Sequence, residues 1–401
     1  MSTKKLLTTK EACQLLGVKP ATLYTYVSRG LIRGVEGEDR RQRRYLAEDV
    51  SRVRARAEAR RGHQAVAVGA LRFGDPVLDT ELCEAGPERL TYRGRDVVAL
   101  VEAGSPFEAV AELLWDAPAL GAPWPWPQAG LLARQSAEVP ELWRFARLIP
   151  RLAEADQARG QHGFAADPAR ARSIIRAFAA SVGPRPGPAP RFDPVARTLA
   201  DRLGVPAKAA PALDAALCLV AEHELNVSTF AARVAASGGA DLYASVGAAL
   251  YAFSGPRHGS APVRIAGLVD ELGSPRRAKA ALLARLERGE TVPGFGHRLY
   301  PGGDPRTLPL VRWAQRLARG KQDKLQTLLA AADAMAGLGP HHMTVDGGLL
   351  ALTYALHLPP AAATALFAVG RSAGWAAHVF EQRQTGALLR PRARYVGPPA
   401  E

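Results

Sequence analysis

The chain has 401 residues, of which 47% are hydrophobic and 22% are charged, a balance that excludes disorder throughout. The length predicts more than one domain. Lysine and arginine outnumber aspartate and glutamate by 52 to 38, and the net charge of +14 indicates an anionic partner such as nucleic acid or an anionic substrate.

The hydrophobic pattern and the cysteines exclude other classes of protein. No apolar run approaches the roughly 20 residues that a membrane span needs, and no apolar segment follows the first lysines to form a secretory signal. Cys13, Cys83 and Cys218 lie far apart, which argues against a disulfide framework or a thiolate metal site. We therefore expect a cytoplasmic protein that binds no metal.

The positive charge is concentrated at the N-terminus. Residues 1–62 hold 15 basic and 7 acidic side chains, whereas the other 339 residues hold 37 and 31. This concentration favours nucleic acid as the partner of the first segment. A general abundance of arginine in the chain is the alternative explanation.

The first helix is predicted by a capping-box pair, Thr8 and Glu11. Gly17 can end this helix. Its apolar face is expected to consist of Ala12, Leu15 and Leu16. A second helix is predicted to begin near Pro20 and to stop at Gly30, so that the two form a helix-turn-helix.

A hairpin should follow the second helix. We expect a strand over 31–33, a polar tip over 36–40 and a strand over 41–46. A third helix is predicted from Ala47. This segment resembles the winged helix-turn-helix of the MerR-like and excisionase-like families.

That resemblance implies DNA binding. Three residues would lie near the start of the recognition helix and face the major groove, namely Thr22, Tyr24 and Thr25. Four arginines would contact phosphates, namely Arg40, Arg41, Arg43 and Arg44. The alternative is a small appended domain that makes protein contacts and whose basic residues are simply solvated.

After a short hinge over 62–68, the chain reads as mostly helical. Two proline-rich loops are expected over 117–128 and 183–194, and minor strands around 72–79. No phosphate-binding loop or dinucleotide fingerprint occurs. The adjacent His341 and His342 are expected in a loop rather than as metal ligands.

Three histidines lie in turns rich in glycine or helix-breaking residues: His223 in AEHELNVST, His258 in GPRHGS and His297 in PGFGHRLYPGGDPR. A glycine-rich turn can bring an imidazole to a substrate while backbone N–H groups approach closely. One such histidine would indicate a structural role. Three together indicate chemistry.

Further motifs surround these turns along the chain. In order, the motifs are RLTYRG, AEHELNVSTFAAR, GPRHG, PGFGHRLYPGGDPR, MTVDGG, LFAVGR and LLRPRARYVG. On these motifs, the chain from Val66 onward resembles citrate synthase. The resemblance implies an all-α, two-domain citrate synthase fold preceded by the winged helix-turn-helix. The implied domains are 1–62 and 65–401, the latter with a large subdomain over 65–260 and 357–401 and a small one over 261–356.

The resemblance also implies the reaction. The family condenses acetyl-CoA with oxaloacetate and hydrolyses the citryl-CoA, which needs a base, a donor to the thioester carbonyl and a donor to the ketone. The implied catalytic residues are Asp346 as base, His258 as donor to the thioester and His297 as donor to the ketone. Oxaloacetate would be held by His223, Arg306, Arg371 and Phe367, with Arg390 supplied by the partner in a homodimer.

The function expected is therefore a citrate synthase of the Si type, with no cofactor beyond its acetyl-CoA substrate and no membrane partner. Two alternatives stay open. One is a 2-methylcitrate synthase that uses propionyl-CoA, and the other is a DNA-binding regulator whose inactive citrate-synthase-like body senses a metabolite. The intact catalytic set favours an enzyme.

Some positions depart from the family pattern. Arg257 replaces a leucine before His258, and the following 259–263 also differ, on the side where CoA would bind. Gly347 and Gly348 stand where many relatives carry bulky residues, which predicts a roomier acyl pocket. His258 is expected to be neutral because a helix begins just after it.

Overall fold

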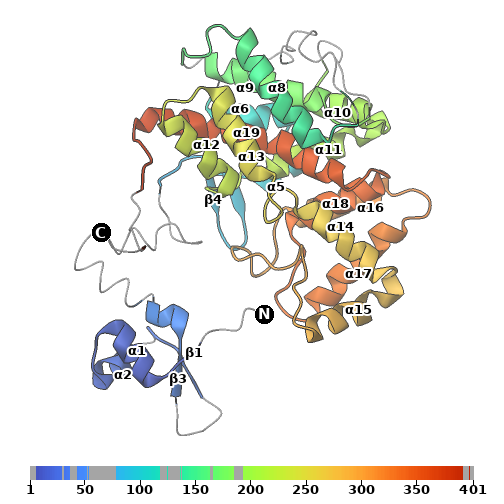
Figure 1. The fold of residues 1–401 in the computed structure, drawn as a ribbon. Helices are drawn as coiled ribbons and strands as arrows, with labels where there is room; N and C mark the ends of the chain where they lie inside the picture. Colours follow the sequence, from blue (N-terminus) through green and yellow to red (C-terminus); the bar gives the residue numbers. More distant parts are fainter. Residues whose placement is uncertain are drawn as a thin grey trace. The chain divides into compact units, whose positions relative to one another are not determined.

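The computed structural model describes residues 6–28, 31–36, 43–51, 53, 78–117, 124, 136, 138–162, 166–184, 193–391 and 397. The chain divides into two compact units, one of residues 1–79 with 391–401 and one of residues 80–390. Each is drawn in Figure 1 and considered by itself below. The predicted boundary between residues 62 and 65 lies outside the described residues, as does nearly all of the region around 72–79 where minor strands were predicted.

The first unit is a small helix-turn-helix with a three-stranded sheet. Its elements are β1 (Leu6–Leu7), α1 (Thr9–Leu16), α2 (Pro20–Ser28), β2 (Gly34–Glu36) and β3 (Arg43–Leu46), followed by helical residues 47–51. The strands are antiparallel in the order β1-β3-β2, and Val35 pairs with Arg44. The predicted hairpin is therefore present.

Local signals place the first helix as the sequence predicts. Thr8 and Glu11 form the complete capping box, and Gly17 ends α1 in the left-handed conformation at φ 64°. The core contains Ala12, Leu23 and Tyr45. Leu15 was expected on the buried face, but it is 42% exposed.

The first strand of the hairpin lies later than predicted, at Gly34–Glu36 rather than over 31–33. Tertiary contacts explain the shift. Ile32 is buried in the core of the unit, and Arg33 pairs with the buried carboxylate of Asp49, 2.8 Å away. Two residues of the predicted strand, Ile32 and Arg33, are therefore held by contacts outside the sheet.

The second unit is predominantly helical, with one small sheet. The sheet is formed by β4 (Cys83–Ala85), β5 (Leu90–Tyr92) and β6 (Arg95–Asp96). The helices are α5 (Val97–Glu102), α6 (Phe107–Trp115), α8 (Glu141–Ala155), α9 (Ala166–Ala180), α10 (Val195–Leu203), η1 (Ala207–Ala209), α11 (Ala210–Val220), α12 (Val227–Ser237), α13 (Leu242–Phe253), α14 (Ala261–Leu272), α15 (Pro275–Glu287), α16 (Thr307–Leu317), α17 (Asp323–Ala336), α18 (Val345–Ala355) and α19 (Ala361–Thr385).

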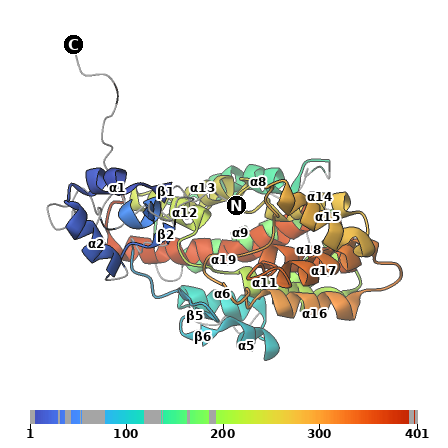
Figure 2. The same cartoon turned by 90° about the horizontal axis from the view of Figure 1, so that it is seen from below.

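Helix α19 is the central helix of this unit, buried along most of its length. It packs against α6, α9, α11, α12 and α13, and Figure 2 shows it running among them. A separate apolar cluster joins α14, α16, α17 and α18. The predicted all-α architecture is confirmed, whereas the subdomain boundaries stay a prediction.

Two glycines allow the backbone of α19 to approach the backbone at the end of α11 closely. A Cβ on Gly370 would lie 2.8 Å from the carbonyl oxygen of Leu217, and one on Gly374 would lie 2.4 Å from that of Ala221. The Gly374 amide donates to the Ala221 carbonyl at 3.1 Å. This close contact places Arg371, between the two glycines, against the end of α11.

We predict that Gly370→Ala lowers the melting temperature because the new methyl would meet the backbone of α11, which cannot move aside as a side chain can. Overpacking of this kind costs about 1–3 kcal/mol. Gly267→Ala in α14 is the control, since a methyl group there would meet nothing within 4 Å and alanine favours helix. Thermal unfolding of both variants checks this. Equal melting temperatures would contradict the account of the α11–α19 contact.

Candidate functional site

Five segments of the second unit carry its predicted site residues other than Arg390. His223 follows the end of α11, and Asn226 caps α12 by accepting from the Thr229 amide at 3.1 Å. The buried His223 ring lies 2.9 Å, Nε2 to hydroxyl, from Tyr300 and 5.5 Å, centre to centre, from the His297 ring. Two of the predicted histidines are therefore neighbours, although they are far apart in the sequence.

Arg306 is fixed by an ion pair on its own loop. Its Nε and Nη2 donate to the two carboxylate oxygens of Asp304 at 2.9 and 2.7 Å, and both side chains are buried. Asp304 also accepts from the Val345 amide at 3.3 Å, at the start of α18. The pair therefore ties the His297 loop to the helix that carries Asp346. Burial and Arg306 both lower the pKa of His297.

Asp346 lies in the first turn of α18 with one unused carboxylate oxygen. Thr344 donates to its Oδ2 at 3.3 Å, and Oδ1 has no hydrogen-bond partner in the described part of the chain. Burial raises its pKa to about 6, while the nearby Arg306 acts in the opposite direction. A carboxylate with this pKa is ionised near neutral pH and basic enough to accept a proton.

His258 is held between Ser228 and an aromatic ring. Its Nε2 lies 2.8 Å from the Ser228 hydroxyl, and its ring lies edge-on to Phe253 at 5.2 Å. The pKa of His258 is lowered to about 4, by burial first and then by the charge of Arg371. The lowered pKa agrees with the neutral His258 imidazole expected from the sequence. Burial and Arg371 account for this direction, and the influence of the helix that follows stays a prediction.

The Ser228 hydroxyl decides which His258 nitrogen carries the proton. Ser228 accepts from the Trp375 indole N–H at 3.0 Å and lies 2.8 Å from Asn226 Oδ1. A serine hydroxyl has one proton to donate. If Ser228 donates this proton to Asn226 Oδ1, then His258 Nε2 carries the imidazole proton and donates it to Ser228. If Ser228 instead donates to His258 Nε2, the imidazole proton lies on Nδ1 and is available to a substrate.

Helix α19 supplies Arg371 and Phe367. The buried Arg371 donates through Nε to the Val220 carbonyl at 2.7 Å, and its guanidinium lies 5.0 Å from the centre of the Phe367 ring. Phe253 packs edge-on against Phe367 at 5.2 Å. Arg390 is different: it is exposed and forms no hydrogen bond or ion pair within the described ranges. This chain alone does not bring Arg390 to the other residues.

The sequence analysis missed several residues that shape this site. They are Phe253, Tyr300, Asp304 and Trp375. Asp304 carried a usable signal, because a carboxylate two residues before a candidate binding arginine can pair with it. The two aromatic rings that meet at His258 and Ser228 lie on α13 and α19, and no sequence pattern links these helices.

Gly347 and Gly348 adjoin filled space, and the predicted roomier acyl pocket stays a prediction. A Cβ on Gly347 would lie 2.4 Å from Cγ of Met343, and one on Gly348 would lie 3.0 Å from Cδ1 of Leu310. These side chains already occupy the space that bulkier residues would take. The glycines reflect tight packing at the start of α18, and they provide no argument for a larger acyl group.

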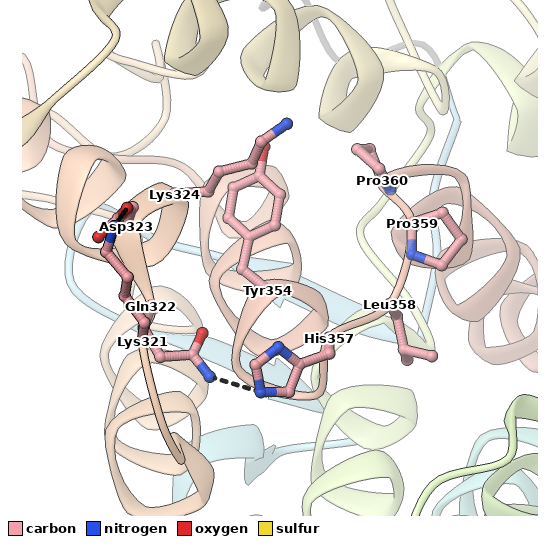
Figure 3. Close-up of a pocket in the computed structure, with 9 residues that line it drawn as sticks. All are labelled: Lys321, Gln322, Asp323, Lys324, Tyr354, His357, Leu358, Pro359 and Pro360. Carbon is pink, nitrogen blue, oxygen red and sulfur yellow. Dashed lines mark hydrogen bonds and ion pairs between the residues drawn. The ribbon is translucent and has the colours of Figure 1, made fainter.

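A separate pocket of about 630 Å³ lies beside the α18–α19 connection (Figure 3). It is lined by Lys321, Gln322, Asp323, Lys324, Tyr354, His357, Leu358, Pro359 and Pro360, and none of these is a predicted catalytic residue. Within the described residues, no group of three or more histidine, cysteine, aspartate or glutamate side chains could hold a metal ion. The helices of the described ranges include none long and apolar enough to cross a membrane.

In the first unit, α2 carries the residues predicted to read DNA. Tyr24 is 51% exposed, Thr25 is exposed with its hydroxyl donating to the Ala21 carbonyl at 3.0 Å, and Thr22 is half-buried. On β3, Arg43 is exposed and Arg44 half-buried. The predicted phosphate contacts Arg40 and Arg41 lie outside the described residues.

Comparison with known proteins gives two family matches. Residues 146–392 match the citrate synthase C-terminal domain, and residues 6–57 match a helix-turn-helix domain. A Mycobacterium tuberculosis protein described as a candidate citrate synthase 2 is 33% identical, over 81% of this chain and 92% of its own length. A 2-methylcitrate synthase of Shewanella oneidensis is 35% identical over 46% of this chain and 50% of its own.

Comparison with solved structures also identifies citrate synthases. Citrate synthase from Thermotoga maritima matches with a TM-score of 0.67 and 26% identity, over 82% of this chain and 95% of its own. The Thermoplasma acidophilum enzyme, solved with carboxymethyl coenzyme A and oxaloacetate, shares the fold with a TM-score of 0.72 and 24% identity, over 81% and 95%. The histidines, Asp346 and buried arginines described above lie within the matched region, and the chain belongs to the citrate synthase family, with a helix-turn-helix domain at its N-terminus.

Proposed function

We propose that the protein is a citrate synthase of the Si type that condenses acetyl-CoA with oxaloacetate and hydrolyses citryl-CoA to citrate and CoA. The observation that carries the proposal is a carboxylate of raised pKa, Asp346, in the same unit as two imidazoles of lowered pKa. A base and two neutral donors are what the condensation requires. No cofactor beyond the acetyl-CoA substrate is needed.

We assign each proton transfer or hydrogen bond of the reaction to a residue in the protonation state that it requires. Asp346 takes a proton from the methyl carbon of acetyl-CoA, while His258 donates a hydrogen bond to the thioester oxygen. The methyl carbon then forms a bond to the ketone carbon of oxaloacetate as the C=O π bond breaks, and the resulting alkoxide takes a proton from His297. Asp346 afterwards releases its proton to solvent, and His297 regains one from solvent. Water finally attacks the thioester carbon and CoA leaves as the thiol.

Oxaloacetate is a dianion, and the arginines are suited to its two carboxylates. Arg306 and Arg371 are buried, where guanidinium groups bind carboxylates strongly. His223 and Phe367 complete this part of the proposed site. Arg390 is proposed to enter from the second subunit of a homodimer.

A second copy is supported by exposed apolar side chains on three neighbouring helices. Trp143 on α8, Val227 and Val234 on α12 and Tyr251 on α13 are between 38% and 67% exposed. Such a patch is typical of an interface. Arg390 forms no hydrogen bond or ion pair with the described residues of its own chain, which accords with a role in a partner.

The choice of acyl group is the open part of the proposal. Relatives named as citrate synthase and as 2-methylcitrate synthase match at 36% and 35% identity over nearly the same share of the chain. Propionyl-CoA is therefore the competing substrate, without the support that Gly347 and Gly348 were expected to provide. An inactive sensor is the third candidate function, and the presence of His258, His297 and Asp346 together favours an enzyme.

We predict oxaloacetate-dependent thiol release from acetyl-CoA, with kcat/KM falling as the pH drops through about 6. Asp346 must be ionised to act as a base, and it becomes protonated below that pH, whereas His258 stays neutral down to about pH 4. Asp346→Asn should lower kcat by about 10²- to 10⁴-fold. Asp333→Asn, an exposed change on α17, should leave it unaltered.

Two results would contradict this proposal. Faster thiol release from propionyl-CoA than from acetyl-CoA would establish the 2-methylcitrate reaction. No release from either thioester, with oxaloacetate still bound, would establish a sensor.

We also propose that the helix-turn-helix unit binds DNA through α2 and the β2–β3 hairpin. The exposed Tyr24 and Thr25 on α2 and the exposed Arg43 on β3 support this. The same fold can serve protein contacts, which is the competing role for this unit.

Binding of the full chain to a mixed-sequence DNA duplex should weaken steeply with salt. Arg43→Gln with Arg44→Gln should reduce the slope of log K against log salt by about 1 to 2, because each phosphate contact releases about one counterion. Arg276→Gln with Arg277→Gln, two exposed arginines of the second unit, is the control. Mobility-shift titrations measure the slope. No binding at low salt would leave this unit as a protein-contact module.

A further inference from the structure

A buried polar chain leads from α12 to the residue before His223. Arg233 Nη1 lies 3.2 Å from His378 Nδ1, and His378 Nε2 lies 2.9 Å from Glu222 Oε1. All three side chains are buried. A guanidinium can only donate, so His378 Nδ1 must accept, and the imidazole proton must lie on Nε2 and be donated to Glu222. The carboxylate of Glu222 is thus held through one oxygen.

The second oxygen of Glu222 lies against α19 at Gly374. This Oε2 has no hydrogen-bond partner among the residues that the structure describes, and a Cβ on Gly374 would lie only 2.0 Å from it. Arg371 lies one turn earlier on α19 and donates to Val220, two residues before Glu222. A buried carboxylate and a buried guanidinium therefore flank the same stretch of backbone, and no direct ion pair between them is found in the described ranges.

The two substrate arginines are compensated in different ways. Arg306 donates two hydrogen bonds to the carboxylate of Asp304. Arg371 donates through Nε to a backbone carbonyl, and its Nη2 has no hydrogen-bond partner within the described residues. Burial lowers the pKa of Arg371, and Glu222 is the strongest influence in the opposite direction. Glu222 is thus the main charge that makes a buried Arg371 tolerable.

We propose that Glu222, held by His378, is a positioning residue that supplies the counter-charge of Arg371 while the site is empty and leaves its guanidinium free for a substrate carboxylate. A complete lack of compensation would destabilise the empty protein, whereas a carboxylate that forms no direct ion pair with Arg371 leaves its Nη2 without a partner among the described residues. The identity of the ligand as oxaloacetate rests on the proposed function, whereas the coupling between Glu222 and Arg371 does not.

The first test compares Glu222→Gln with the wild type by calorimetric titration of oxaloacetate. Glutamine can still accept from His378, so the substitution removes the charge and keeps the hydrogen bond. We expect the Kd of oxaloacetate to fall about tenfold, because the anion becomes the sole compensation of Arg371. We also expect a lower melting temperature without ligand and a larger rise on adding it.

Glu381→Gln is the matched control for a merely structural effect. It removes a charge from the same network, where Glu381 pairs with Arg233 at 2.5 Å, ten residues after Arg371 on α19. It should lower the melting temperature without changing the Kd of oxaloacetate. Equal effects of Glu222→Gln and Glu381→Gln on Kd would overturn the proposal.

The second test needs no ligand. In a double-mutant cycle of Glu222→Gln and Arg371→Gln, the double variant should lose less stability than the two single losses predict together, because each single change leaves one buried charge without its counterpart. Additive losses would overturn the proposal. A wild type that neither binds nor turns over oxaloacetate, but shows this coupling, would refute the proposed function alone.

Discussion

The buried positive charge of Arg306 and Arg371 is the constraint on which the candidate site depends. Both guanidinium groups lie in the interior, where an uncompensated charge is costly and a compensated one is fixed in place. Arg306 is compensated locally by Asp304, two residues earlier. Arg371 depends on the close approach of α19 to α11, which Gly370 and Gly374 permit. Backbone packing and charge placement are thus linked.

The same two arginines help to set the protonation of the groups proposed to do the chemistry. After burial, Arg371 is the charge that lowers the pKa of His258, and Arg306 lowers that of His297. Arg306 also limits how far burial raises the pKa of Asp346. Neutral donors and an ionised base can therefore coexist in one site near neutral pH. The buried positive charge proposed to attract an anion therefore also favours neutral histidines.

Much of this could be predicted from the sequence, where local signals are strong. The capping box of Thr8 and Glu11 formed as expected, and the glycine-rich turns around His258 and His297 marked the site. Prediction was limited where distant elements meet. The packing of Met343 against Gly347, and of Phe253 against His258, depends on tertiary contacts that no local pattern records. Charge balance at Arg371 likewise requires knowing which carboxylate is near it in space.

Oxaloacetate binding to Arg371→Lys, measured by calorimetry, tests the central claim most directly. Lysine keeps the positive charge but cannot reproduce the two-pronged guanidinium contact with a carboxylate. Loss of one or two charge-assisted hydrogen bonds should raise the Kd about 10- to 100-fold. The control is Arg312→Lys, an exposed change on α16 beside Glu102, which should leave the Kd unaltered. An unchanged Kd in a folded Arg371→Lys protein would contradict the placement of a substrate carboxylate at Arg371.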